Sequence, residues 1–253
     1  RAFIRPDAAN GLGSVFGVLA HEPSGTLWAC SVPSFIAPPR PGAMNELVAF
    51  DLASGALSAR HAFPPGRATC NDMSVAPDGA VLVADTQGGR ILRLPPKGEA
   101  LEIFAEDARL RGVDGIAFSG DGRLYVNNVQ SGAMLRVETG TDGKFSALAE
   151  LKVSEKLGGP DALRLIEGNR FLQAEGTSGR ITEVTIVGDE AHIRVLRAGL
   201  DSSPGVTRVG DTAYAIEGKI RYLIDPKLKG QDPGPFRIIA IPIPGGAQPT
   251  ANQ

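Results

Sequence analysis

The 253-residue sequence lacks long hydrophobic runs, strong net charge and many aromatic side chains. Its formal net charge is −2 and only 6% of its residues are aromatic, so the composition favours neither a nucleic-acid nor a membrane partner. The longest apolar runs, such as IIAIPIP at 238–244, are far shorter than the roughly 20 residues that span a bilayer. We therefore expect a globular protein with a small-molecule partner, and its oligomeric state stays open.

Motifs for several catalytic chemistries are also missing. The sequence has no G-x-S-x-G nucleophile turn, no phosphate-binding glycine loop and no CxxC pair. The three histidines, His21, His61 and His192, do not have the spacing of metal ligands. Nothing in these patterns supports a serine hydrolase, a nucleotide-binding enzyme or a zinc protein.

Turn residues are abundant, with 32 Gly and 19 Pro spread along the chain. Five segments share one pattern, in which alternating apolar residues precede a glycine turn and a second apolar strand. The segments begin at positions 17, 71, 114, 161 and 204, and this spacing matches the period of a four-stranded propeller blade. Two more apolar strands follow each hairpin. The sequence therefore predicts an all-β propeller of four-stranded antiparallel blades.

The predicted propeller is a single domain over residues 1–253, with blades at 15–64, 70–106, 113–151, 160–199 and 203–244. The segment AFIRP at 2–6 resembles a lone fourth strand, so residues 1–10 are interpreted as the remnant of a further blade. The first three strands of that blade would then lie upstream of Arg1. The chain begins without methionine, which indicates either a removed leader or a fragment. Six blades are therefore favoured, and a five-bladed ring is the alternative.

The first strand of each blade lines the central channel of a propeller, so the residues that begin the five hairpins should form a ring. Three of them carry side-chain oxygens, namely Asn71, Asp114 and Asp161, while Gly17 and Pro204 do not. Two carboxylates and an amide suit a hard cation such as Ca²⁺. Alternatively, Asn and Asp at these positions only bond to the local backbone at strand starts.

The two cysteines fall at related positions of the repeat. Cys30 ends a second strand and Cys70 begins the first strand of the next blade, on the same face. A disulfide between them is geometrically plausible and would favour a periplasmic or secreted location. The alternative is a pair of buried free thiols, which would leave the compartment open.

The longest connection inside a blade is SVPSFIAPPRPGAMN at 31–45, which should overhang the channel mouth. Long loops in compact domains are often functional. We expect Phe35 and Ile36 to face the substrate, although a proline-stiffened surface loop is an equal alternative.

Three pieces of the sequence resemble the regucalcin/gluconolactonase family, which is related to calcium-dependent phosphotriesterases. They are NDMSVAPDG (71–79), DGIAFSGDGRLYVNN (114–128) and GGPDALRL (158–165), and the last of these is the most specific. The resemblance covers roughly residues 14–244. It implies a propeller enzyme with one channel Ca²⁺ that is held by a Glu, an Asn and an Asp.

The resemblance also implies roles for single residues. Asp161 corresponds to the family's metal ligand and proposed base or nucleophile, and Asn71 to a residue that contacts substrate or metal. Asp114 stands where the family has Asn, which is a departure. The family's Glu belongs to a blade that would lie upstream of Arg1.

These observations lead to three functional hypotheses. The first is a metal-dependent hydrolase of lactones or related esters, with Asp161 as ligand and general base and Asn71 and Asp114 completing the calcium site. The second is a propeller that binds a ligand without catalysis. The third is a metal-free enzyme like the strictosidine synthases, in which an axial carboxylate acts alone.

Overall fold

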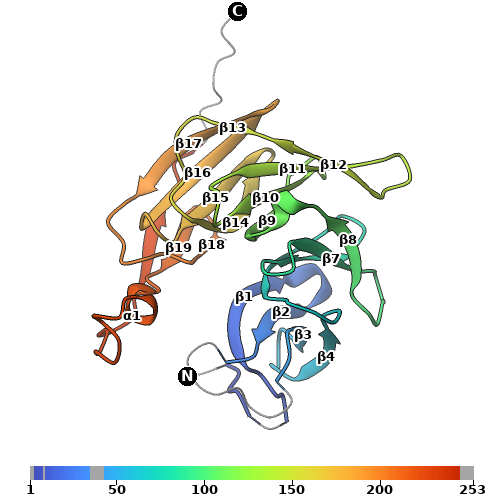
Figure 1. Cartoon of the computed structure of the whole chain (residues 1–253), viewed down its shortest axis with the longest axis horizontal. Helices are drawn as coiled ribbons and strands as arrows, with labels where there is room; N and C mark the ends of the chain where they lie inside the picture. The colour runs from blue at the N-terminus through green and yellow to red at the C-terminus, as the bar shows by residue number, and fades with distance from the viewer. Residues whose placement is uncertain (1–2, 8, 35–42, 246–253) are drawn as a thin grey trace, which may run out of the picture.

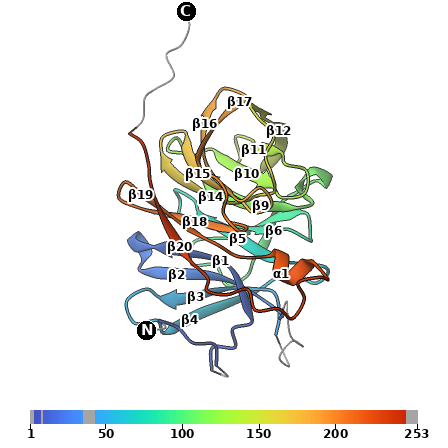
Figure 2. The ribbon, with the colours of Figure 1, turned by 90° about the vertical axis from the view of Figure 1, so that its left-hand side faces the viewer.

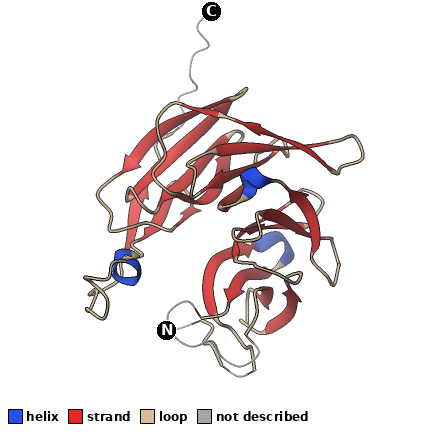
Figure 3. Ribbon diagram, in the orientation of Figure 1, coloured by secondary structure: helices blue, strands red, loops and turns tan. Residues whose placement is uncertain are grey.

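The computed structural model describes residues 3–7, 9–34 and 43–245, and strands dominate it (Figure 3). Helical structure in these residues is limited to short turns at Glu22–Ser24, Ala108–Leu110 and α1 (Arg221–Ile224). None of the described helices is long and apolar enough to cross a membrane. The predicted all-β class is confirmed.

The strands form five antiparallel sheets, which we number as blades in chain order. Blade 1 contains β1 (Ser14–His21), β2 (Thr26–Val32), β3 (Glu46–Asp51) and β4 (Leu57–Ala62). Blade 2 contains β5 (Cys70–Val75), β6 (Val81–Asp85), β7 (Arg90–Leu94) and β8 (Glu102–Glu106). Blade 3 contains β9 (Val113–Phe118), β10 (Leu124–Asn128), β11 (Met134–Thr139) and β12 (Phe145–Glu150).

The last two blades depart from the four-stranded pattern. Blade 4 contains β14 (Pro160–Glu167), β15 (Arg170–Glu175), β16 (Arg180–Val187) and β17 (Glu190–Arg197), and β13 (Lys152–Val153) adds a parallel edge strand. Blade 5 has three strands, β18 (Gly205–Val209), β19 (Thr212–Ile216) and β20 (Ile238–Pro242).

The blades follow one another around a common axis, from blue to red in Figures 1 and 2. The first strand of each blade is innermost, and these strands contact in sequence, β1 with β5, β5 with β9, β9 with β14 and β14 with β18. Apolar side chains fill the space between neighbouring blades, for example Leu82 with Ile116 and Tyr125 with Phe171. Burial of these facing surfaces is what holds a propeller together.

Two expectations about the blades are wrong. The described residues form five blades rather than six, as the alternative stated. Residues 3–7 form no strand, and Ile4 instead packs against an apolar cluster that contains Ala29, Val48 and Phe50 of blade 1. The predicted blade at 203–244 also lacks one of its four strands, because at residues 218–225 Lys219 has a left-handed backbone (φ 49°) and a helical turn, α1, follows it.

The two cysteines form the disulfide that the repeat positions made plausible. Cys30 on β2 and Cys70 on β5 are fully buried, and their Cα atoms are 5.1 Å apart. The bond therefore joins blades 1 and 2 next to the axis. It also holds the start of β5, the strand that carries Asn71.

Replacing both cysteines (Cys30→Ala with Cys70→Ala) should lower the free energy of unfolding by about 2–4 kcal/mol, because the bond closes a long loop in the unfolded chain. Urea unfolding of the variant and the wild type measures the difference. Wild type unfolded with a reductant serves as control and should match the variant. Equal midpoints for the variant and the oxidised wild type would contradict a stabilising disulfide.

Candidate functional site

A β-bulge at the start of the inner strand recurs in blades 1 to 4. In each case two consecutive residues of the inner strand face a single residue of its partner strand. Such bulges kink a strand and change where its side chains point. The paired positions are Phe16–Gly17, Asn71–Asp72, Asp114–Gly115 and Asp161–Ala162. In blade 5, β18 pairs with β19 in regular register.

Each of the three predicted polar ring residues is the first residue of a bulge. Asn71 has this position in blade 2, Asp114 in blade 3 and Asp161 in blade 4. In blade 1 the equivalent residue is Phe16, so the alignment that placed Gly17 in the ring is off by one position. Pro204 lies just before β18 and lines the same pocket as Asp161.

The second bulge positions allow the inner strands to approach closely. A Cβ atom on Gly17 would overlap the carbonyl oxygen of Asn71, and one on Gly115 would overlap that of Asp161. Neighbouring bulges are therefore packed backbone against backbone, which requires glycine at these points. The second positions of blades 4 and 2 are not glycine: they carry Ala162 and Asp72, and Asp72 is the polar one.

Asn71, Asp114 and Asp161 lie together at the axis. The Asn71 Nδ2 donates hydrogen bonds to Asp114 Oδ2 (2.8 Å) and to Thr86 Oγ1 (2.9 Å). Asp114 and Asp161 lie close enough for each to shift the pKa of the other. The structure thus brings together the three residues that were predicted as metal ligands.

Both axial carboxyl groups have raised pKa values. Burial, followed by the nearby charges of Asp161 and Asp72, raises the pKa of Asp114 well above its usual value of 3.8. Burial is also the main cause that raises the pKa of Asp161 to about 7, although its hydrogen bond with Asp114 opposes the shift. The environment therefore disfavours two negative charges at this point unless a proton or cation accompanies them.

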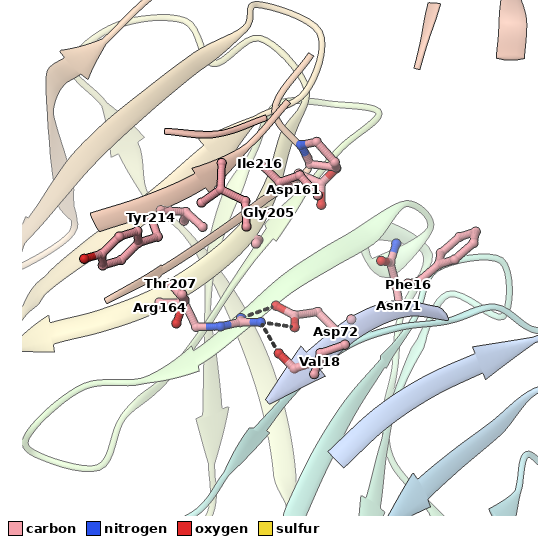
Figure 4. A pocket seen from close by; sticks show the side chains of 15 residues that line it. Phe16, Val18, Asn71, Asp72, Asp161, Arg164, Gly205, Thr207, Tyr214 and Ile216 are labelled. Carbon is pink, nitrogen blue, oxygen red and sulfur yellow. Dashed lines mark hydrogen bonds and ion pairs between the residues drawn. The ribbon is translucent and has the colours of Figure 1, made fainter. Parts of the chain in front are cut away.

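A buried ion pair lies beside these residues, and sequence reasoning missed it. Arg164 of β14 donates from Nη1 and Nη2 to the two carboxylate oxygens of Asp72 on β5, at 2.6 and 2.8 Å (Figure 4). Its Nη2 also lies 3.5 Å from the Val18 carbonyl oxygen of β1. Arg164 thus spans the axis from blade 4 to blades 2 and 1. The sequence did contain a sign of this pair, namely a single arginine within the otherwise apolar segment ALRL of the inner strand.

Two hollows meet at this cluster. A pocket of about 270 Å³ lies where blades 1 and 5 face each other, and Asn71, Asp72, Asp161 and Arg164 form its polar side. Its other lining residues are mostly apolar, including Val18, Ile216 and Ile238. A second hollow of about 400 Å³ reaches Asp114 from the face on which the inner strands begin, and Asn71 lines both. Small molecules can therefore approach the carboxylates from these spaces.

The predicted substrate residues Phe35 and Ile36 lie outside the described residues, so their placement stays a prediction. The acidic residues that end the second strands are held by local hydrogen bonds. Asp85 accepts hydrogen bonds from the Thr69 and Gly88 amides and from Arg90. Glu175 and Glu217 are bonded in the same way to a backbone amide and to an arginine.

The donor chemistry of the axial cluster suits a hard cation. In the described part of the chain, no group of three His, Cys, Asp or Glu side chains is arranged to hold a metal. The axial cluster offers two carboxylates and one amide instead. Asp114 Oδ1 is buried without a hydrogen-bond partner, and a buried carboxylate oxygen of this kind normally has one. These residues therefore fit Ca²⁺ in kind.

Comparison with known proteins identifies the fold and no family. No protein-family model and no curated protein sequence matches the chain. Solved structures do match, at 14–19% identity for the three described next, and such similarity defines only the β-propeller fold.

The first of these structures is virginiamycin B lyase from Staphylococcus aureus (17% identity, TM-score 0.59), which covers 80% of this chain and 63% of the lyase. The chain thus spans less than two thirds of the lyase's length. The second is a candidate gluconolactonase (19%, TM-score 0.55, 81% and 86% covered). The third is luciferin-regenerating enzyme (14%, TM-score 0.62, 93% and 94% covered).

The raised pKa of Asp161 predicts a pH-dependent stability in protein freed of metal by a chelator. Between about pH 4 and pH 7 the folded state holds a proton that the unfolded state has lost, so stability should fall as the pH rises. Urea unfolding across this range measures the slope. The variant Asp161→Asn should reduce the fall, whereas Asp121→Asn, in an exposed turn, should keep it. An unchanged slope in Asp161→Asn would contradict the assignment.

Proposed function

We propose that this protein is a hydrolase of lactones or related small esters, with its active site at Asn71, Asp114 and Asp161 and Ca²⁺ as cofactor. The observation that supports it most is the charge of the axial cluster. Arg164 matches Asp72 through two hydrogen bonds, and no arginine or lysine is paired with Asp114 or Asp161 among the described residues. One divalent cation would balance the two remaining carboxylates.

Asn71, Asp114 and Asp161 would hold the cation. A bound Ca²⁺ would polarise the ester carbonyl and offset the charge that develops on its oxygen. Asp114 Oδ1, which is buried without a partner, supplies the clearest ligand atom. The hydrogen bond from Asn71 keeps the Asp114 carboxylate in place.

Asp161 would act as the general base. It borders the pocket, where a carboxylate oxygen that does not hold the cation could accept a proton from a water molecule. In the proposed reaction, a water molecule loses a proton to Asp161 and adds to the carbonyl carbon. The carbon–oxygen ester bond then breaks, and the departing oxygen takes the proton, so a lactone becomes a hydroxy acid.

The pocket supports a substrate with an apolar body. Val18 of blade 1 and Ile216 of blade 5 are 48% and 41% exposed and line opposite sides of it (Figure 4). We propose in addition that the segment around Phe35 and Ile36 selects the substrate. The disulfide also supports an oxidising, secreted or periplasmic location, since such bonds are rare in reducing compartments.

Two other functions remain as alternatives. The contact between Asp114 and Asp161 supports a metal-free enzyme, in which the two groups share one proton and serve as acid and base. A propeller that only binds a ligand would use the same pocket without turnover. The three proposals differ in how activity responds to a chelator.

Substituting the proposed base (Asp161→Asn) should reduce hydrolysis by at least about 100-fold, because general base catalysis contributes this much or more. A pH-stat assay on a panel of γ- and δ-lactones, including gluconolactone, measures the rate. Circular dichroism should show that the variant is folded, and the control Asp142→Asn, in an exposed turn, should retain full activity.

Chelation separates the alternatives in the same assay. Loss of activity with EDTA and recovery with Ca²⁺ supports the metal-dependent hydrolase. Activity that survives EDTA supports the metal-free carboxyl pair. A wild type without turnover on the whole panel contradicts both enzymes and leaves the binding propeller.

A further inference from the structure

Asp72 and Arg164 occupy an unusual place among the ion pairs of the described residues. The other ion pairs of these residues lie within one blade, within a connecting segment or between neighbouring blades, whereas this pair joins blades 2 and 4 across the axis. Asp72 is buried, and the pair lies on the polar side of the pocket that contains Asp161. It is therefore part of the wall of the proposed site.

Each partner is coupled to a proposed cation ligand through the backbone. Asp72 is the second residue of the bulge whose first residue is Asn71. Arg164 follows Asp161 by three positions on β14. Because both strands meet at the axis, the charges of the pair lie close to the two unmatched carboxylates. At such distances inside a protein, a unit charge changes the binding of an ion substantially.

We propose that Asp72 and Arg164 are positioning residues whose two charges cancel, which keeps the net charge of the axial site at about −2, the charge that a divalent cation balances. The proposal rests on the function proposed above. Counting full charges, Asp72, Asp114 and Asp161 contribute three negative charges and Arg164 contributes one positive charge. Because the two charges of the pair cancel, losing either residue alone changes the charge beside the cation ligands, whereas losing both does not.

The charge count predicts opposite effects of two single substitutions. Asp72→Asn leaves an unmatched Arg164, reduces the negative charge and should weaken Ca²⁺ binding at least about tenfold. Arg164→Gln keeps hydrogen-bond donors for Asp72 and increases the negative charge. It should bind Ca²⁺ as tightly as the wild type or more tightly, and it should favour La³⁺ over Ca²⁺ by a larger ratio than the wild type.

The double variant, Asp72→Asn with Arg164→Gln, restores the original charge and should bind Ca²⁺ within about threefold of the wild type. Isothermal titration of each chelator-treated protein with Ca²⁺ and with La³⁺ measures these affinities. A matched control removes another ion pair of blade 4, with Arg170→Gln and Glu183→Gln. This control should leave both affinities unchanged, because that pair does not line the site's pocket.

A purely structural ion pair would give a different pattern. Both single variants would then weaken Ca²⁺ binding, and the double variant would stay weak, because the contact between β5 and β14 is lost in all three. That result overturns the charge-setting role. Circular dichroism confirms that each variant is folded, and if Asp72→Asn does not fold, Asp72→Ser takes its place.

The titration separates this inference from the proposed function. Wild type that binds no Ca²⁺ overturns the metal site and this inference together. Wild type that binds Ca²⁺ and hydrolyses lactones, with both single variants weakened, overturns only the inference. The predicted affinities without lactone turnover would support the inference and contradict the hydrolase.

Discussion

The repeated β-bulge at the start of the inner strands is the constraint on which the site depends. Inner strands converge at the axis, where a regular alternation would send every second side chain into a blade interface. The extra residue of each bulge turns two consecutive side chains away from the regular pattern. Asn71 and Asp72 both reach the axial pocket for this reason. Glycine at positions 17 and 115 then lets neighbouring strands pack backbone to backbone.

Charge at the axis follows from this geometry. The bulges concentrate three carboxylates, and burial raises the pKa values of two of them, Asp114 and Asp161. Arg164 neutralises the charge of one carboxylate, because its guanidinium donates two hydrogen bonds to Asp72. The remaining imbalance makes a bound cation or a shared proton physically reasonable. The acidic residues at the ends of the second strands differ from this cluster, because each of them is paired. Asp85, Glu175 and Glu217 accept hydrogen bonds from arginines and backbone amides.

The similar solved structures show how weakly the fold constrains chemistry. A lyase, a candidate gluconolactonase and luciferin-regenerating enzyme share this architecture with the chain at under 20% identity. Such a scaffold places loops and inner-strand residues around one axis, and function depends on which side chains stand there. The proposed function therefore depends on the axial residues of this chain rather than on the fold.

The sequence by itself determined the blade repeat, the strand class and the convergence of Asn71, Asp114 and Asp161, because glycine turns and apolar alternation are local signals that recur at a fixed period. It also made the Cys30–Cys70 bond plausible. Sequence reasoning failed for residues 3–7 and 218–225, where packing of Ile4 and the backbone of Lys219 overrode strand-like composition. Only the tertiary structure decided that Asp72 meets Arg164, because these residues are 92 positions apart and the bulges that aim them have no local sequence signature. The charge of the site is therefore a property of the assembled axis.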